Sequence, residues 1–486
     1  MALNLASPGI VVREVDLTIG RVDATSGSIG ALVAPFTKGP VEDAQLIESE
    51  EDLLQTFGQP YSVDKHYEYW MVASSYLAYG GTLQVIRADD YNTLTGVGLK
   101  NAFVGTASSI RIKSDTHYNQ LGYDDNTITG VTIASKTPGT YANGLRVAII
   151  DAKADQVLTV SGISTVGLGI TQSAAGRIVA GAGGTSVLDG YIKGIVTEVG
   201  TGTISVKTLA HVSTAGTVTN VNYQNGGVYN FATGNISASA AGTNVGGTAQ
   251  SVTAAVDWFE QQNIVLTQTD ANGNPLKLEW DALADRPSTS TYVSSRGGRF
   301  DELHVVVIDD KGTITGNAGT ILEKHLNLSK AKDAEYSVGS TSYWRKYLAT
   351  NSQYIYGGSA PGITTSAFVS GTATAIGNLD ADSGWDQDGG EVNFGLSGVV
   401  TSSLAGGTNY GDKTDYTTSG ALTSGVDDLI TGYGLFENKE EIEVDFILMG
   451  AAHHPKEQSQ ALAEKCIAVA EAVSYTHLTL PTILLV

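Results

Sequence analysis

Cysteine and basic residues are scarce in this chain of 486 residues. The one cysteine, Cys466, cannot form a disulfide within the chain, which is typical of folding in a reducing compartment. Lysine and arginine total 28 against 50 aspartates and glutamates, so the formal net charge is −22. Nucleic-acid binding is therefore not expected, because it requires clustered cations. Self-association would require complementary patches that overcome the repulsion between like-charged copies.

The chain also lacks long apolar runs and the short motifs of common enzymes. No basic segment followed by an apolar one opens the sequence, so we expect no signal peptide. No run of about 20 apolar residues predicts a membrane-spanning helix. Neither a Gly-x-x-x-x-Gly-Lys-Ser/Thr phosphate loop nor a Gly-x-Ser-x-Gly nucleophile elbow is present. We predict no catalytic residues, no cofactor and no membrane insertion.

Two features could supply a metal ligand or a nucleophile, and each has a simpler explanation. His453 and His454 precede a helical pattern without the His-Glu-x-x-His spacing of a zinc site, so a polar pair at the start of a helix is predicted. Cys466 lies on the apolar face of that helix, where a small buried thiol is expected rather than a nucleophile.

Acidic residues cluster at one place in the chain: Asp380, Asp382, Asp386, Asp388 and Glu391. They could hold Ca²⁺, but Gly384 and Trp385 break the order of an EF-hand, and an acidic surface loop is predicted. Asp270 to Asn274 also begins like a calcium loop, but Pro275 occupies the position that needs glycine. Asn272-Gly273 there predicts a β-hairpin instead. We therefore predict no metal site.

Composition indicates a turn-rich β protein, because glycine reaches 58 residues while charged residues are only 16%. We predict a multidomain α+β fold, with an α/β core that is discontinuous in sequence and inserted antiparallel β-rich domains of the sandwich or barrel type. The predicted divisions are an extended arm (1–20), an α/β subdomain (21–90), a β-rich extension (91–156), an inserted Gly/Thr/Ser-rich β domain (157–256), a β/α core segment (257–356), a Gly/Ser/Asp-rich surface excursion (357–424), the start of a C-terminal core (425–472) and a non-native tail (473–486).

The local sequence predicts the positions of several strands and helices. Strands are predicted over Ile29–Ala34, Ala44–Ile47, Thr82–Ile86, Leu145–Ile150 and Glu440–Met449. Ser49 is expected to cap a helix, with Asp52 three residues on as its capping-box partner and Gly58 at its end. A helix over His453–Val473 is expected to bury Leu462, Cys466, Ile467, Val469 and Ala470.

The segment 157–256 has a different composition from its surroundings. It carries only five charged residues: Arg177, Asp189, Lys193, Glu198 and Lys207. Spaced valine and isoleucine among Thr, Ser and Gly favour a folded β-sandwich or barrel, with low-complexity disorder as the alternative.

Residues 1–20 are predicted to be an extended arm, because Ser7-Pro8-Gly9 disfavours a helix. Its strand-forming residues are Ile10, Val11, Val12, Arg13, Glu14 and Val15. Alternation places Val11, Arg13 and Val15 on one face of that strand. A single terminal strand must add to a sheet, either in its own subunit or in a neighbouring one.

Residues 300–335 are the most distinctive stretch. Leu303–Ile308 is an apolar β-branched run, Asp310-Lys311-Gly312 predicts a tight turn, and Thr313–Thr315 is expected to begin the return strand. The phrase Ser-Lys-Ala-Lys-Asp follows at 329–333. This stretch resembles the core of tail sheath proteins from contractile-tailed bacteriophages. The arm and residues 28–90, about 137–150, 300–356 and 425–472 resemble the same family in the same order, whereas 157–256 lies outside the resemblance.

The resemblance implies a structural virion protein. Such protomers polymerise as hexameric rings around an inner tail tube and contract to drive the tube through the host envelope for genome ejection. It implies that Ile10–Val15 extends the sheet of a neighbouring subunit. The implied partners are further copies of the chain, the tube protein, and the baseplate and tail terminator proteins. The implied location is the phage tail, after assembly in the host bacterial cytoplasm.

Two other functions are also compatible with the sequence. An extracellular adhesin or surface-layer β protein would suit the Thr/Gly-rich insert and the acidic surface, although the α/β unit at 28–90 and the missing signal peptide disfavour it. A phage-like contractile injection device would use the same kind of sheath protomer.

Residues 473–486 are predicted not to be native. A strand followed by a crossover helix calls for a parallel strand, and Pro481 would break one early. One choice of codons for residues 473–482 reproduces a transposase-end adapter. We therefore expect the native sequence to differ after about Ala472.

Overall fold

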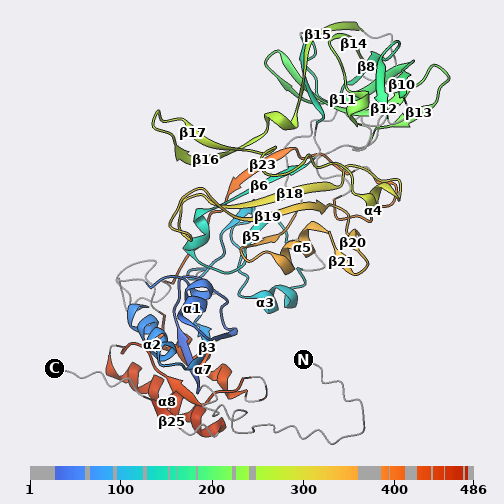
Figure 1. The fold of residues 1–486 in the computed structure, drawn as a ribbon. Helices are drawn as coiled ribbons and strands as arrows, with labels where there is room; N and C mark the ends of the chain where they lie inside the picture. Colours follow the sequence, from blue (N-terminus) through green and yellow to red (C-terminus); the bar gives the residue numbers. More distant parts are fainter. Residues whose placement is uncertain are drawn as a thin grey trace, which may run out of the picture. The chain divides into compact units, whose positions relative to one another are not determined.

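The computed structural model contains both helices and many strands, arranged in several sheets (Figure 1). It describes residues 28–479 except 61–65, 91–95, 124–127, 152–153, 161, 182–183, 222–225, 240–247, 360–384, 393, 411–423, 439, 441, 454 and 474–476. The chain divides into two compact units. Among the described residues, the first combines 28–98 with 410–479, and the second is Leu99–Asn409.

The first unit is built on a five-stranded sheet. In spatial order its strands are β2 (Ala44–Ile47), β3 (Thr82–Arg87), β1 (Ile29–Ala34), β24 (Phe446–Leu448) and β25 (His477–Thr479). All neighbours are parallel except β2, which runs antiparallel to β3. The helices of this unit are α1 (Glu50–Phe57), α2 (His66–Ala78), α7 (Val426–Gly434), η4 (Leu435–Glu437) and α8 (Lys456–Val473).

Helices cover both faces of β1. A Cβ placed on Gly30 would lie 3.0 Å from the ring of Tyr76 in α2, and one on Gly432 of α7 would lie 2.5 Å from Val33. Gly30 and Val33 are three residues apart, so they point to opposite faces of the sheet. This two-sided burial explains why β1 reads as a continuous apolar run.

The predicted start and end of α1 are confirmed. Ser49 accepts a hydrogen bond from the Asp52 backbone N–H at 3.1 Å, and its hydroxyl donates to the Asp52 carboxylate at 2.8 Å. Gly58 ends the helix with φ of +86°, a conformation that glycine adopts at little cost. Strands β1 and β2 have their predicted bounds, and β3 extends one residue beyond its predicted end.

Two predictions near the C-terminus are wrong in detail. The strand expected over Glu440–Met449 is limited to β24, because the Ile442 N–H donates to the Asn438 carbonyl in a turn before it. Ile467 is 44% exposed rather than buried. It lies about 100° around the helix from Cys466, whereas Leu462 and Val469 share the buried face with that cysteine. Strand β25 pairs with β24 where a parallel strand was expected after α8, and the non-native origin of residues 473–486 stays a prediction.

The second unit has a four-stranded antiparallel sheet, smaller sheets and hairpins, and a larger β domain described below. The four-stranded sheet runs in the order β19 (Thr320–Ser329), β18 (Glu302–Asp309), β6 (Leu145–Asp151) and β23 (Val399–Ser403). A three-stranded sheet contains β22 (Ile355–Gly357), β5 (Val131–Ser135) and β4 (Phe103–Gly105). Two hairpins are β16 (Asn263–Thr269) with β17 (Pro275–Glu279), as predicted from Asn272-Gly273, and β20 (Glu335–Ser337) with β21 (Ser340–Thr341). The helices are α3 (Asp115–Gln120), η1 (Thr140–Gly144), η3 (Phe259–Gln261), α4 (Thr291–Ser294) and α5 (Trp344–Asn351).

The return strand after β18 begins later than predicted. The Asp309 carboxylate accepts hydrogen bonds from the backbone N–H groups of Thr313, Ile314 and Thr315 at 2.8–2.9 Å. These groups are therefore unable to join a strand ladder, and β19 starts only at Thr320.

The segment after residue 384 is not the surface excursion that was predicted. Trp385, Phe394 and Leu396 are buried, and β23 adds to the outer edge of β6. Backbone hydrogen bonds hold the segment in place: the Asp386 N–H donates to the Lys330 carbonyl at 3.0 Å and the Phe394 N–H donates to the Arg299 carbonyl at 2.9 Å. The rest of the predicted excursion, 360–384 and 411–423, lies outside the described residues.

The segment of unusual composition forms a closed antiparallel barrel (Figure 1). Its strands are β7 (Gln156–Val160), β8 (Gly169–Ser173), β11 (Tyr191–Gly200), β12 (Thr203–Val212), β13 (Val218–Asn220), β14 (Gly234–Ser239) and β15 (Thr248–Asp257), accompanied by a separate hairpin of β9 (Ile178–Gly181) with β10 (Gly184–Val187) and by η2 (Gly226–Tyr229). The order β11-β8-β14-β15-β7-β12 closes because β12 pairs back with β11. Of the two predicted architectures, sandwich and barrel, the structure has the barrel.

Candidate functional site

The predicted strand-exchange residues, Ile10–Val15, lie outside the described residues, so the role of the arm stays a prediction. The structure does describe a surface to which an extended segment could add. Strand β2 is the last strand of its sheet, and no strand in the described part of the chain pairs with its outer edge. Leu46 on β2 is 51% exposed. Edge strands of this kind present backbone donors and acceptors to a further strand.

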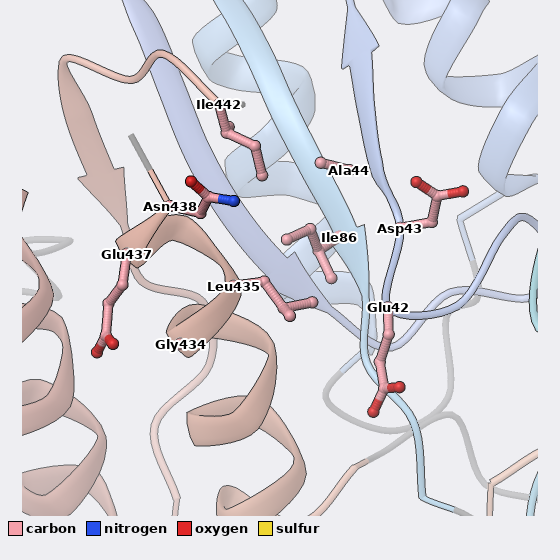
Figure 2. Close-up of a pocket in the computed structure, with 9 residues that line it drawn as sticks. All are labelled: Glu42, Asp43, Ala44, Ile86, Gly434, Leu435, Glu437, Asn438 and Ile442. Carbon is pink, nitrogen blue, oxygen red and sulfur yellow. The ribbon is translucent and has the colours of Figure 1, made fainter. Parts of the chain in front are cut away.

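A groove of about 640 Å³ lies beside β2 (Figure 2). It is lined by Glu42, Asp43, Ala44, Ile86, Gly434, Leu435, Glu437, Asn438 and Ile442. Figure 2 shows Ile86, Leu435 and Ile442 between β3 and η4, with carboxylates on either side of these apolar side chains. One of the carboxylates, Glu437, accepts a hydrogen bond from Lys465 at 2.6 Å. An apolar floor with anionic margins suits a segment that carries apolar and cationic side chains.

The distinctive Ser-Lys-Ala-Lys-Asp phrase forms a buried polar cluster at the end of β19. Lys330 is fully buried, and its ammonium donates three hydrogen bonds. The acceptors are Asp151 Oδ2 at 2.8 Å and the carbonyl oxygens of Phe300 at 2.9 Å and Gly395 at 2.8 Å. The ammonium has three N–H groups, so this environment satisfies all of them.

Asp151 is the acceptor that joins this lysine to a distant segment. It is the last residue of β6 and is fully buried. Besides Lys330, its carboxylate accepts the backbone N–H groups of Ser397 and Gly398, each at 2.6 Å. The pair therefore fixes the chain just before β23 to the end of the four-stranded sheet.

The other residues of the phrase also have identifiable roles. Ser329 donates to the Asp301 carboxylate, which also accepts the backbone N–H of Ser290 at 2.8 Å. Asp333 accepts the Gly389 N–H at 2.7 Å. Ala331 belongs to a buried apolar cluster with Val293, Ala334 and Phe394. The phrase thus connects β19 to α4 and to the segment after residue 384.

Burial controls the electrostatics of this cluster. Loss of solvation lowers the pKa of Lys330, and the Asp151 charge acts in the opposite direction. Burial raises the pKa of Asp301 against the hydrogen bonds that it accepts from Ser329 and Ser290. Burial also raises the pKa of the neighbouring Glu302 to about 7.

The other polar candidates have structural partners. His453 Nε2 lies 2.8 Å from the Tyr69 hydroxyl, and the His453 backbone N–H donates to Ser459 Oγ of α8 at 2.7 Å. His454 lies outside the described residues. Cys466 is buried as predicted, and burial raises the pKa of its thiol to about 12.

Of the acidic cluster, Asp380 and Asp382 lie outside the described residues. Asp386 accepts the Tyr343 hydroxyl at 2.5 Å, and Arg345 lies 3.5 Å from its carboxylate. Asp388 and Glu391 are exposed. No group of three or more His, Cys, Asp or Glu side chains in the described part of the chain is arranged to hold a metal ion. No helix there is long and apolar enough to cross a membrane.

Comparison with known proteins identifies one class of relative. The chain is 36% identical over 91 residues to the tail sheath protein of Enterobacteria phage T4, and 34% identical over 91 residues to that of Vibrio phage KVP40. Each match covers 19% of this chain and 13% of the relative's length. A segment of the chain is therefore similar to phage tail sheath proteins.

Two further comparisons add nothing to this. No family model matches the chain. A sheath tail protein of known structure from Listeria innocua aligns with 49% of this chain and 36% of its own, at 14% identity and a TM-score of 0.17. A likeness at that level carries no argument about the fold.

Sequence reasoning singled out Ser329–Asp333 but missed Asp151, which lies 179 residues away from Lys330. One signal was available. An aspartate that directly follows a buried apolar strand, as Asp151 follows Leu145–Ile150, must find a cation or several N–H groups if it is buried too. The identity of that cation could not be predicted from the positions of the residues in the sequence.

Proposed function

We propose that this chain is the tail sheath protomer of a contractile-tailed bacteriophage, a structural protein and not an enzyme. Copies would polymerise as hexameric rings around an inner tube and contract to drive the tube through the host envelope for genome ejection. The observation that carries this proposal is the similarity of 91 residues to the tail sheath proteins of two phages. Two compact units suit a protein that must keep its fold while its neighbours move.

The proposed self-assembly uses the arm and the edge of β2. Val11, Arg13 and Val15 share one face of the arm, and the groove beside β2 offers an apolar floor with the carboxylates of Glu42 and Asp43 beside it. Strand addition would provide directional backbone hydrogen bonds between a protomer and a second copy. These would act as tethers and offset the repulsion that follows from a net charge of −22.

The remaining partners follow from the same proposal. They are the inner tube protein, the baseplate and the tail terminator, with no nucleic acid and no membrane insertion. The protomer would assemble in the host cytoplasm and reside in the virion tail.

Deletion of residues 1–16 tests the proposal. Electron microscopy of the full chain, carrying its native sequence after about Ala472, should show ringed tubes with a hollow centre, and the deletion variant should show none. Circular dichroism and a thermal melt should show that the variant stays folded, because the arm precedes β1. Tubes in the deletion variant would refute the tether, and flat lattices or monomers from the full chain would favour a surface-layer protein or adhesin.

A further inference from the structure

The barrel is attached to the rest of the second unit by a buried ion pair of its own. Lys207 of β12 is 3% exposed, and its Nζ lies 3.2 Å from Asp155 Oδ1. Asp155 directly precedes β7, and its other oxygen accepts the backbone N–H of Thr208 at 2.6 Å. Arg286, which lies before β18, donates to the Asp155 carbonyl at 3.1 Å and lies 3.5 Å from its carboxylate. One carboxylate thus contacts the barrel wall and the chain outside it.

Phe300 connects this ion pair to the Lys330 cluster. The Lys207 ammonium lies 4.5 Å from the centre of the Phe300 ring, within cation–π range. The carbonyl oxygen of Phe300 accepts the Lys330 hydrogen bond at 2.9 Å. One buried apolar cluster combines Ile195 and Leu209 of the barrel with Phe300 and Leu396. A single residue therefore contacts both buried lysines, one through its ring and one through its backbone.

The backbone of Phe300 has an uncommon conformation. Its φ is +63°, in the left-handed region that bulky residues rarely adopt. The Phe300 N–H donates to Thr289 Oγ1 at 3.0 Å while Lys330 holds the carbonyl. Strained residues persist only where their surroundings hold them, and they cluster at functional sites.

The connection from the barrel to the following segment, directly after β15, is anchored as well. Trp258 and Phe259, which directly follow β15, are buried in one apolar cluster with Ala148 of β6 and Val306 of β18. Arg299 donates to the Leu209 carbonyl of β12 at 3.3 Å. The contacts around the junction are therefore apolar, ionic and hydrogen-bonded at once.

We infer that Phe300, held between Lys207 and Lys330, is a coupling residue that makes the barrel and the four-stranded sheet one rigid, cooperative body. Without the Lys207 side of this coupling, the barrel would pivot on its two connections. The inference concerns the isolated protomer and does not depend on assembly. In a sheath, the coupling would carry load from the barrel to the core.

A matched pair of lysine variants tests the inference. Lys207→Met removes the buried charge, and Lys193→Met makes the same change on the half-exposed lysine of the neighbouring strand β11. Spin labels on cysteines introduced at the exposed positions Ala215 of the barrel and Lys346 of α5 report the distance between the two parts. Native Cys466 is buried, so it does not compete for the label. Pulsed electron paramagnetic resonance is measured after dilution with unlabelled protein.

The parent protein and the Lys193→Met variant should each give one narrow distance. Lys207→Met should lose that single distance and show a separate melting step for the barrel. An unchanged narrow distance with one melting step in Lys207→Met would overturn the inference. If Lys207→Met fails to fold, Asp155→Asn decides in the same way, because asparagine keeps an acceptor for Thr208 but removes the charge that attracts Lys207.

Discussion

The five-stranded sheet of the first unit and the four-stranded sheet of the second are both buried on two faces, but they are held differently at their ends. In the first, β1 is flanked by apolar side chains of helices on both faces. In the second, carboxylates at the strand ends accept backbone N–H groups from loops: Asp151 from 397–398 and Asp309 from 313–315. The core of the first sheet depends on packing volume, although the buried Arg87 at the end of β3 donates to the Phe36 and Gly39 carbonyls. The carboxylate contacts at the strand ends of the second sheet depend on charge. Mutations and pH should therefore distinguish them.

The largest loss in the free energy of unfolding is expected when the buried Lys330–Asp151 ion pair loses its lysine. Lys330→Met would leave Asp151 buried without its cation, which costs about 3–5 kcal/mol in comparable pairs. Urea unfolding of the variant and the parent measures the change in the free energy of unfolding.

Lys332→Met is the matched control, because Lys332 belongs to the same phrase but is exposed. Its effect should stay within about 0.5 kcal/mol. Equal effects of the two variants would show that the buried pair has no special role. The end of the four-stranded sheet would then be held by packing, as the core of the first unit is.

The next largest loss of stability is expected in the apolar core of the first unit. Leu32→Ala on β1 would open a cavity in an apolar core and should cost about 2–5 kcal/mol. Leu46→Ala, on the exposed edge strand β2, makes the same change where solvent already has access, and should cost much less. Because no charge is involved, the loss caused by Leu32→Ala should be the same at pH 5 and pH 8. A loss that depended strongly on pH would contradict the distinction between the units.

The fold could be predicted from the sequence where the signals are local, and not where the structure depends on contacts between distant residues. The Ser49 cap and strands β1 to β3 were predicted well, because their signals lie within a few residues of one another. The start of β19 was not, because the Asp309 side chain competes for the backbone N–H groups of the expected strand. Lys330 and Asp151 could not be paired, because their contact depends on how strands far apart in the chain are arranged. Local propensity carries no information of that kind.

The smallest of the three effects concerns the carboxylate of Glu302, the first residue of β18. Its carboxylate accepts only the Ser288 N–H, at 2.9 Å, among the hydrogen bonds described, and burial raises its pKa to about 7 from an ordinary 4.5. The folded state therefore binds a proton that the unfolded state releases between these two values. The stabilisation that this provides is complete below about pH 4.5 and is lost as the pH rises to about 7. A shift of this size corresponds to at most about 3 kcal/mol.

Glu302→Gln should remove this dependence, because the amide cannot ionise while its oxygen still accepts the Ser288 N–H. The variant should match the parent near pH 4.5 and exceed it in the free energy of unfolding above pH 7. Glu279→Gln, at an exposed position of β17, should leave the profile unchanged. Urea unfolding at several pH values from 4.5 to 8 measures all three proteins. If Glu302→Gln instead lost stability at high pH, the ionised carboxylate would be a favourable part of the fold, and the carboxylates of the second unit would have to be considered as one charged network rather than as separate strand ends.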